Sequence, residues 1–289
     1  MPPQSIHPVP PGGSSFTLKP IAETHLEAAL RLSRQTGWPH RLEDWAMALS
    51  LSQGVIAVDS HGEAVGTVLL TPFGPDAATI NMVIVDRDRR GQGLGRRLMA
   101  AALEIGGARR LRLVATPDGM PLYRQLGFVE AGIVAQHQGQ VLPVPAPAGV
   151  TLADSHDLDA IITLDRAATG ADRAGLIAAI AATGRFAVLR QDRTPIGFAA
   201  LRPFGRGEVI GPVAAATAPE AKALIAFFLA RRPGAFLRVD SHVAQGLGAW
   251  LAARGLPQVD TGTDMHRPAP APRLSPPVSI FALASQAVG

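Results

Sequence analysis

Apolar residues recur first at helical and then at strand spacing along the first half of the 289-residue chain. Leu26, Leu30 and Ser33 follow helical spacing, and Pro39 is expected to open a second helix because proline is favoured in the first helical turn. A third helix is predicted from Leu94 to Ile105. The predicted strands cover residues 55–58, 64–70, 79–85, 111–115 and 128–134, with a short helix at 120–126. This order predicts an α/β fold, a mixed sheet with helices on both faces.

The second half repeats this pattern. Residues 186–205 align with residues 56–74, with one extra residue at the turn, and residues 250–256 align with residues 122–128. The repeat is too long for a solenoid unit, so we expect two copies of one domain. The predicted domains are a disordered leader at 1–15, a first domain at 16–140, a Pro- and Ala-rich linker at 141–149, and a second domain at 150–289 that ends in an extended segment.

Composition narrows the class of protein. The chain is 47% hydrophobic and 17% charged, with a net charge of +4 and neither a membrane-spanning run nor a signal peptide, which predicts a cytoplasmic protein. Cysteine is absent and the histidines lack metal-ligand spacing, so no metal is expected. The arginines are not interleaved with aromatic residues, so neither nucleic acid nor a membrane is an expected partner. A homodimer is left open.

Glycines alternate with other residues in "RRGQGLGRRL", directly after the predicted strand at 79–85. A Walker loop would need a lysine here, and a dinucleotide fingerprint would need a glycine in place of Arg96. The remaining pattern is Arg90-x-x-Gly93-x-Gly95, between a strand and a helix. Backbone N–H groups and the helix dipole at such a point form an anion site that suits a pyrophosphate.

This strand–loop–helix unit is followed by a strand and by "PLYRQLGF", and it resembles the GNAT superfamily of acetyl-CoA-dependent N-acetyltransferases over residues 16–140. The motifs "GWPHRLEDW" and "IFALASQAVG" resemble a two-domain bacterial group whose second half is a degenerate GNAT domain. The resemblance implies tandem GNAT folds with acetyl-CoA as co-substrate. It also implies transfer of the acetyl group to a primary amine, of a small molecule or a protein, by direct attack in a ternary complex. The alternative is an inactive acyl-CoA-binding sensor or structural protein.

The resemblance also implies which residues serve the acetyl donor. The backbone of Val83, Ile84 and Val85 would bind the pantetheine arm, and one of its N–H groups could stabilise an oxyanion. Tyr123 would be the general acid, since a phenol with a pKa of about 10 stays protonated at neutral pH. The alternative is that Tyr123 only packs or orders the sulfur. The expected cofactor-binding residues of the loop are Arg90, Gly91, Gln92, Gly93, Leu94, Gly95 and Arg96.

On the acceptor side the candidates are Trp38, His40, Asp44 and Thr116. His40 and Asp44 are spaced i,i+4 on the predicted second helix, so His40 could be a base oriented by Asp44, or the group could line an acceptor pocket. The competing interpretation is a helix start with a local charge pair. A turn alone would explain Thr116.

The second copy lacks the residues of the loop. No glycine occurs between Pro212 and Leu229, and Glu220 falls near the expected phosphate end. Leu251 occupies the position that corresponds to Tyr123. We therefore expect the second domain to be non-catalytic.

Overall fold

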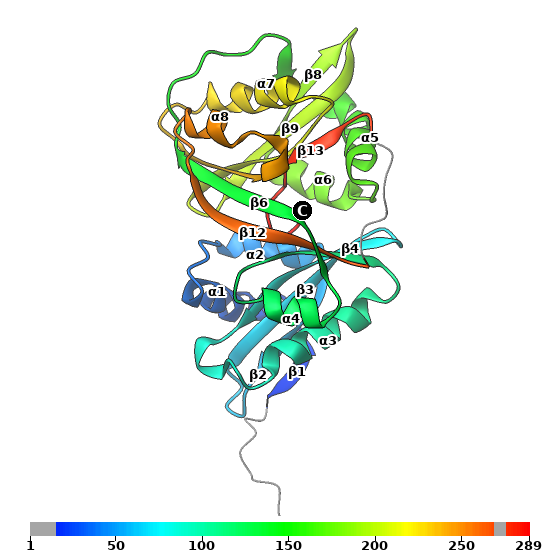
Figure 1. Ribbon diagram of the computed structural model, residues 1–289, viewed down its shortest axis with the longest axis vertical. Helices are drawn as coiled ribbons and strands as arrows, with labels where there is room; N and C mark the ends of the chain where they lie inside the picture. Colours follow the sequence, from blue (N-terminus) through cyan, green and yellow to red (C-terminus); the bar gives the residue numbers. More distant parts are fainter. Residues whose placement is uncertain (1–15, 269–275) are drawn as a thin grey trace, which may run out of the picture.

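The computed structural model describes residues 16–268 and 276–289, so the leader predicted at 1–15 lies outside the described residues. The strands form one 13-stranded mixed sheet that runs through both halves of the molecule (Figure 1). Its order is β1-β2-β3-β4-β5-β12-β6-β11-β10-β9-β8-β7, with β13 paired to β10. The predicted α/β class with a mixed sheet is therefore confirmed. Among the described residues, no helix is both long and apolar enough to cross a membrane.

The first half packs helices on both faces of its part of the sheet. Val68 and Leu70 of one strand pack toward the third helix, whereas Leu69 between them packs against the first two helices. Its elements are β1 (Thr17–Pro20), η1 (Glu23–His25), α1 (Leu26–Gln35), α2 (Leu42–Ser50), β2 (Gln53–Val58), β3 (Ala64–Phe73), β4 (Ala77–Val85), η2 (Arg87–Arg89), α3 (Leu94–Gly106), β5 (Arg110–Ala115), α4 (Met120–Gln125) and β6 (Val129–Gln140).

The predicted start of α2 is wrong. Pro39 and His40 lie in the connection before the helix, which begins at Leu42. The reason is Asp44, whose Oδ2 accepts the backbone N–H of Arg41 at 2.9 Å and so caps the helix at that point. Because His40 precedes the cap, it does not share a helix face with Asp44.

The second half repeats the element order of the first, which confirms the predicted duplication. Two apolar clusters form its core, one around α7 and one around α5 and α6. Its elements are β7 (Val150–Leu152), η3 (Ser155–Asp157), α5 (Leu158–Thr169), α6 (Ala174–Thr183), β8 (Arg185–Gln191), β9 (Thr194–Phe204), β10 (Gly207–Ala215), α7 (Ala218–Leu229), β11 (Phe236–His242), η4 (Val243–Gln245), α8 (Gly248–Ala252), β12 (Gln258–Arg267) and β13 (Ser279–Ala282).

The two halves exchange their β6 and β12 strands. β12 of the second half pairs with β5 of the first, with Thr263 opposite Ala115. β6 of the first half pairs with β11 of the second, with Gln136 opposite Asp240. These two exchanged strands lie side by side and cross the middle of the molecule (Figure 1). Each half therefore completes its sheet with a strand of the other.

Each half also contains a parallel strand pair that splits. The β4–β5 ladder ends at Thr79 opposite Arg112, and the β10–β11 ladder ends at Val209 opposite Arg238. In the second half, β13 fills the split by pairing with β10, and the Leu283 N–H donates to the carbonyl of β11 residue Asp240 at 2.8 Å. No described strand fills the corresponding split between β4 and β5.

Candidate active site

The glycine loop holds its backbone open at the N-terminus of α3. Gly91 and Gly93 have φ angles of +74° and +78°, in the left-handed region that glycine adopts without strain. A Cβ at either position would meet no atom within 4 Å, so the loop is not packed against the rest of the fold. Gly93 is the N-cap of α3 and has no side chain to satisfy the first helical N–H groups. These donors and the helix dipole are therefore available to an anion.

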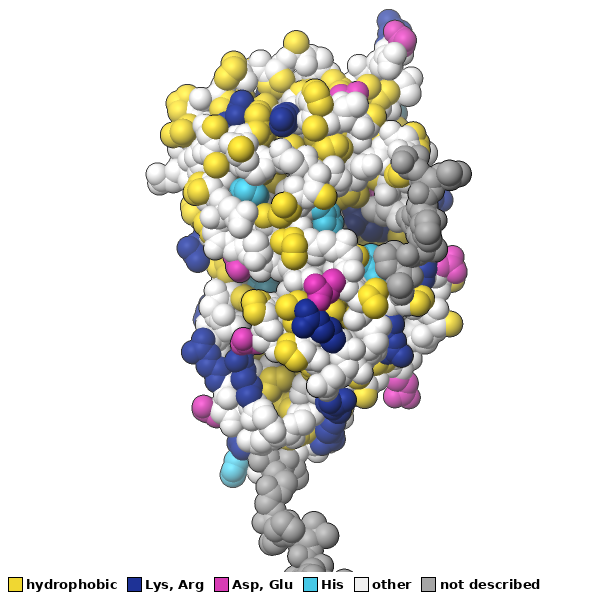
Figure 2. Space-filling view, in the orientation of Figure 1, with side chains coloured by type: hydrophobic (Ala, Val, Ile, Leu, Met, Phe, Trp, Pro, Cys, Tyr) yellow, Lys and Arg dark blue, Asp and Glu magenta, His cyan; other side chains and the backbone are white. Residues whose placement is uncertain are grey.

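The loop lies beside α4. Gly95 has an ordinary helical conformation, and a Cβ there would lie 3.4 Å from Leu122 Cδ2. Arg90 Nη1 lies 3.2 Å from Asp118 Oδ2, and Arg96 donates to Gln125. Lys and Arg side chains flank the lower half of the molecule, which contains this loop (Figure 2). Open backbone donors and exposed guanidinium groups are the donor set that a pyrophosphate requires, so these residues fit CoA.

A distortion of β4 accompanies the split in the sheet. Met82 has a φ of +48°, and the register between β3 and β4 shifts within the same stretch. Thr67 Oγ1 donates to the Met82 carbonyl at 2.8 Å, which holds the distorted backbone. Beyond Thr79, the β5-facing backbone of β4 has no partner strand among the described residues. This stretch includes Val83, Ile84 and Val85, the residues expected to bind the pantetheine arm.

A cavity of about 320 Å³ opens beside this split and is lined by both halves. From the first half, Trp38, His40, Asn81, Val83, Thr116 and Tyr123 contribute. From the second half, Phe204, Arg206, Arg238, Asp260, Ser285 and Gln286 contribute. Of the acceptor-side candidates, Trp38, His40 and Thr116 therefore reach the cavity, and Asp44 does not.

Tyr123 is buried in the wall of this cavity. Burial raises the pKa of its phenol to about 12, so the hydroxyl stays protonated at any physiological pH. The ring meets Phe128 edge to face, with centroids 6.2 Å apart, which fixes its orientation. The hydroxyl makes no hydrogen bond with the described residues, which leaves it as a donor for a bound ligand.

His40 is held among aromatic rings at the junction of the two halves. Its ring lies 5.7 Å from Trp38 and 5.9 Å from Phe204, centroid to centroid. Burial lowers the pKa of His40 to about 4. The positive charges of Arg238 and Arg202 also lower this pKa, whereas the negative charge of Asp44 raises it. The imidazole is therefore neutral at pH 7.

The hydrogen bonds of His40 pass through Ser33. Ser33 Oγ accepts the indole N–H of Trp45 at 2.9 Å and lies 3.1 Å from His40 Nδ1. Either group of the Ser33–His40 pair can be the donor, because the hydroxyl has one proton and a second lone pair. This contact fixes the position of the imidazole ring.

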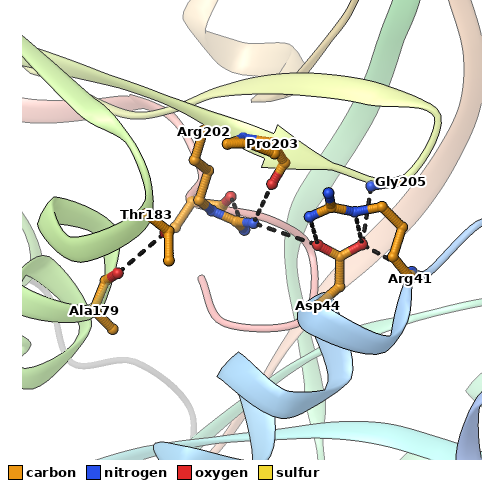
Figure 3. Close-up of polar contacts among 8 residues, drawn as sticks. Arg41, Asp44, Ala179, Thr183, Arg202, Pro203 and Gly205 are labelled. Carbon is orange, nitrogen blue, oxygen red and sulfur yellow. Dashed lines mark hydrogen bonds and ion pairs between the residues drawn. The ribbon is translucent and has the colours of Figure 1, made fainter. Parts of the chain in front are cut away.

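Asp44 joins the two halves instead of facing the cavity (Figure 3). Its Oδ2 accepts the backbone N–H of Gly205 at 2.9 Å, and its Oδ1 lies 2.8 Å from Arg41 Nη2 and 4.0 Å from the buried Arg202. Burial opposes the charge, but hydrogen bonds from Arg41 and Gly205 outweigh it and lower the pKa of Asp44. No hydrogen bond joins His40 to Asp44 among the described residues, so the alternative in which Asp44 orients His40 is not formed, whereas the local charge pair of Asp44 with Arg41 is.

Sequence reasoning missed several cavity residues. Asn81 is buried, and its Nδ2 donates to Thr71 Oγ1 at 2.9 Å and to the Thr79 carbonyl at 3.3 Å. Its Oδ1 has no partner among the described residues. Arg206 and Arg238 belong to the second half, and no local motif indicated that they approach the first.

The N-terminus of α7, which corresponds to that of α3, is closed. Glu220 Oε2 accepts the N–H groups of Ala216 and Thr217 at 3.0 and 3.1 Å, and Thr217 Oγ1 accepts the N–H of Glu220. The start of α7 is thus capped by side chains of the chain itself, whereas α3 has no side-chain cap.

The split between β4 and β5 and the open glycine loop lie in the first half, and the cavity beside the split is lined by both halves. Residues 21–128 match the model of the acetyltransferase (GNAT) family. Residues 161–276 match the model of an acetyltransferase (GNAT) domain. The chain belongs to the GNAT superfamily of acyltransferases and contains two GNAT domains.

Individual relatives are similar over most of the chain. The uncharacterized N-acetyltransferase YitH of Bacillus subtilis is 29% identical over 228 residues, which cover 76% of this chain and 80% of YitH. A putative acetyltransferase of Pyrococcus horikoshii has a TM-score of 0.79 at 17% identity and covers 99% of both chains. A tandem GNAT protein of the clavulanic acid biosynthesis pathway has a TM-score of 0.61 at 17% identity, over 89% of this chain and 100% of that chain. At these identities the two solved structures show the shared fold alone.

Proposed function

We propose that the chain transfers the acetyl group of acetyl-CoA to a primary amine by direct attack in a ternary complex. The observation that carries the proposal is the open N-terminus of α3 beside the split between β4 and β5. This arrangement supports a ligand with an anionic end at the loop and an extended arm along β4. Acetyl-CoA has both features and supplies an activated thioester.

The residues of β4 and α4 have separate roles in this proposal. The backbone N–H groups within Val83–Val85 that face β5 bind the pantetheine arm, and one of them stabilises negative charge on the thioester oxygen. Such a donor is typically worth about 3 kcal/mol. Tyr123 donates its proton toward the departing sulfur, and its raised pKa keeps that proton in place until the sulfur leaves.

The amine nucleophile is held by the cavity. Asn81 lines this cavity, and its buried Oδ1 has no hydrogen-bond partner among the described residues. His40 lines this cavity, and its pKa of about 4 makes it a poor base at neutral pH. Trp38 and Thr116 line the same space. The amine releases its proton to solvent, and solvent returns a proton to the Tyr123 phenolate after the sulfur has left.

The test is a panel of primary amines scored by release of free CoA, with Tyr123→Phe as the variant. We expect at least one amine to accelerate CoA release well above hydrolysis. Tyr123→Phe should lower kcat by about two orders of magnitude while the KM for acetyl-CoA stays within about twofold, because general acids typically contribute 10²–10⁴-fold.

Two outcomes would oppose the proposal. Unchanged turnover in Tyr123→Phe would remove the acid role. Tight binding of acetyl-CoA without acceleration by any amine would favour a sensor or structural protein instead.

A further inference from the structure

The cavity wall contributed by the second half carries more positive than negative charge. Arg206 and Arg238 line the cavity, and Asp260 is the acidic residue of the same lining. Asp260 Oδ1 accepts the N–H of Thr261 at 2.8 Å, so part of its hydrogen-bonding capacity is used locally. The lining therefore has an excess of guanidinium groups.

Arg206 is a free cation at this wall. It lies in the turn between β9 and β10, directly after the Gly205 N–H that Asp44 holds. Its side chain is exposed and forms no ion pair or hydrogen bond with the described residues. Because Asp44 ties this turn to α2, the position of the Arg206 backbone is fixed by the contact between the halves.

Arg238 is held rigidly beside it. Its Nε lies 3.0 Å from both carboxylate oxygens of the fully buried Asp240, and its Nη2 lies 2.9 Å from Oδ2. Its guanidinium carbon lies 5.2 Å from the centroid of the Phe204 ring. The bidentate pair orients the guanidinium and leaves the N–H groups of Nη1 free for a ligand.

These charges discriminate among amines. A polyamine would bring several positive charges against Arg206, which has no counter-charge among the described residues, and this is unfavourable in a partly enclosed site. An amine that also bears an anion would gain charge-assisted hydrogen bonds from the same arginines. The positive wall also favours the neutral, nucleophilic form of the amine over the ammonium.

Resting on the proposed function, we infer that the acceptor is an amine that carries a carboxylate or phosphate, which Arg206 and Arg238 bind. The first half then supplies the groups for transfer, and the second half supplies the groups that select the acceptor.

The experiment compares matched acceptors in the full chain. L-phenylalanine is paired with 2-phenylethylamine, glucosamine 6-phosphate is paired with glucosamine, and spermidine is the polycation. The variant is Arg206→Gln, and the control is Arg185→Gln, which changes an exposed arginine of β8 away from the cavity.

We expect the anionic member of at least one pair to have a kcat/KM about tenfold or more above its neutral partner, with spermidine the poorest acceptor. A preference within the first pair indicates a carboxylate, and one within the second pair a phosphate. Arg206→Gln should remove most of the preference through a higher acceptor KM, with the KM for acetyl-CoA unchanged. Arg185→Gln should preserve it.

The inference and the proposed function fail in different ways. If no acceptor of any kind is acetylated, the proposed function fails and the inference with it. If neutral amines or spermidine are acetylated as well as the anionic acceptors, or if the two arginine variants behave alike, transfer stands and the inference alone is overturned.

Discussion

Asp44 shows how one side chain links local structure to the assembly of the molecule. Its carboxylate caps α2 through the N–H of Arg41 and holds the β9–β10 turn through the N–H of Gly205. It also lies near Arg202, which is almost fully buried and whose pKa is lowered by burial to about 10. The sequence made Asp44 an acceptor-side candidate. Sequence alone does not distinguish an aspartate in an active site from one that caps a helix and joins two domains.

Asp44→Ala should therefore destabilise the chain strongly. Removing the carboxylate leaves Arg202 buried without its nearest counter-charge, and breaking a buried pair in this way costs about 3–5 kcal/mol. Urea unfolding of the variant measures the loss. Asp172→Ala, which removes an exposed partner of Arg166, should change the free energy of unfolding far less, because water and salt screen exposed ion pairs. Equal effects in the two variants would show that Asp44 is not a structural link.

At the scale of elements, the connection between α1 and α2 forms part of the contact between the halves. His40 lies in this connection and packs against Phe204 at the end of β9. Its lowered pKa follows from this packing, because the ring leaves water on folding and meets two arginines. The junction between the halves is therefore sensitive to acid.

The stability of the junction should fall as the pH drops from about 6.5 to about 4. In this range the unfolded state binds a proton at His40 that the folded state, with a pKa of about 4, does not bind. Between pH 7 and pH 5, the free energy of unfolding of the wild type should fall by roughly 2 kcal/mol more than that of His40→Asn. Urea unfolding at both pH values measures the difference. Equal losses in the two proteins would contradict the buried, neutral imidazole.

Local sequence patterns could predict most elements but not their partners. The periodicity of residues 64–70 and 94–105 gave β3 and α3, since both depend on contacts near in sequence. The predicted start of α2 was wrong because the prediction relied on the preference of proline for the first helical turn. In the structure, the cap that Asp44 supplies at Arg41 sets the start instead. β6 and β12 would be strands whether they paired with strands of their own half or of the other half. Only long-range pairing decides which strands they join.

The same limit applies to the candidate site. The glycine loop and Tyr123 could be found because their motif is local. Asn81 could not, since its significance lies in a buried Oδ1 that only packing leaves unpaired. Arg206 and Arg238 face the cavity because the halves are tied together, and nothing in either segment alone indicates that approach.

At the scale of the whole molecule, the same fold occurs twice, and the two copies differ at the split in the sheet and at the helix N-terminus beside it. The first copy leaves the split between β4 and β5 open and keeps the donors of α3 free. The second copy fills its split with β13 and covers its helix N-terminus with Glu220. Residues 285 and 286, which follow β13, then line the shared cavity. The account therefore predicts one acetyl-CoA site per chain, in the first half.

Titration calorimetry of the full chain with acetyl-CoA tests this claim most directly. We expect one site per chain. Gly95→Ala should weaken binding at least about tenfold without loss of stability, because its Cβ would lie 3.7 Å from Val85 of the expected pantetheine-binding stretch, while alanine is favoured within a helix. Glu220→Ala in the second half should leave the stoichiometry and the affinity unchanged. Two sites per chain, or weaker binding in Glu220→Ala than in Gly95→Ala, would contradict the account.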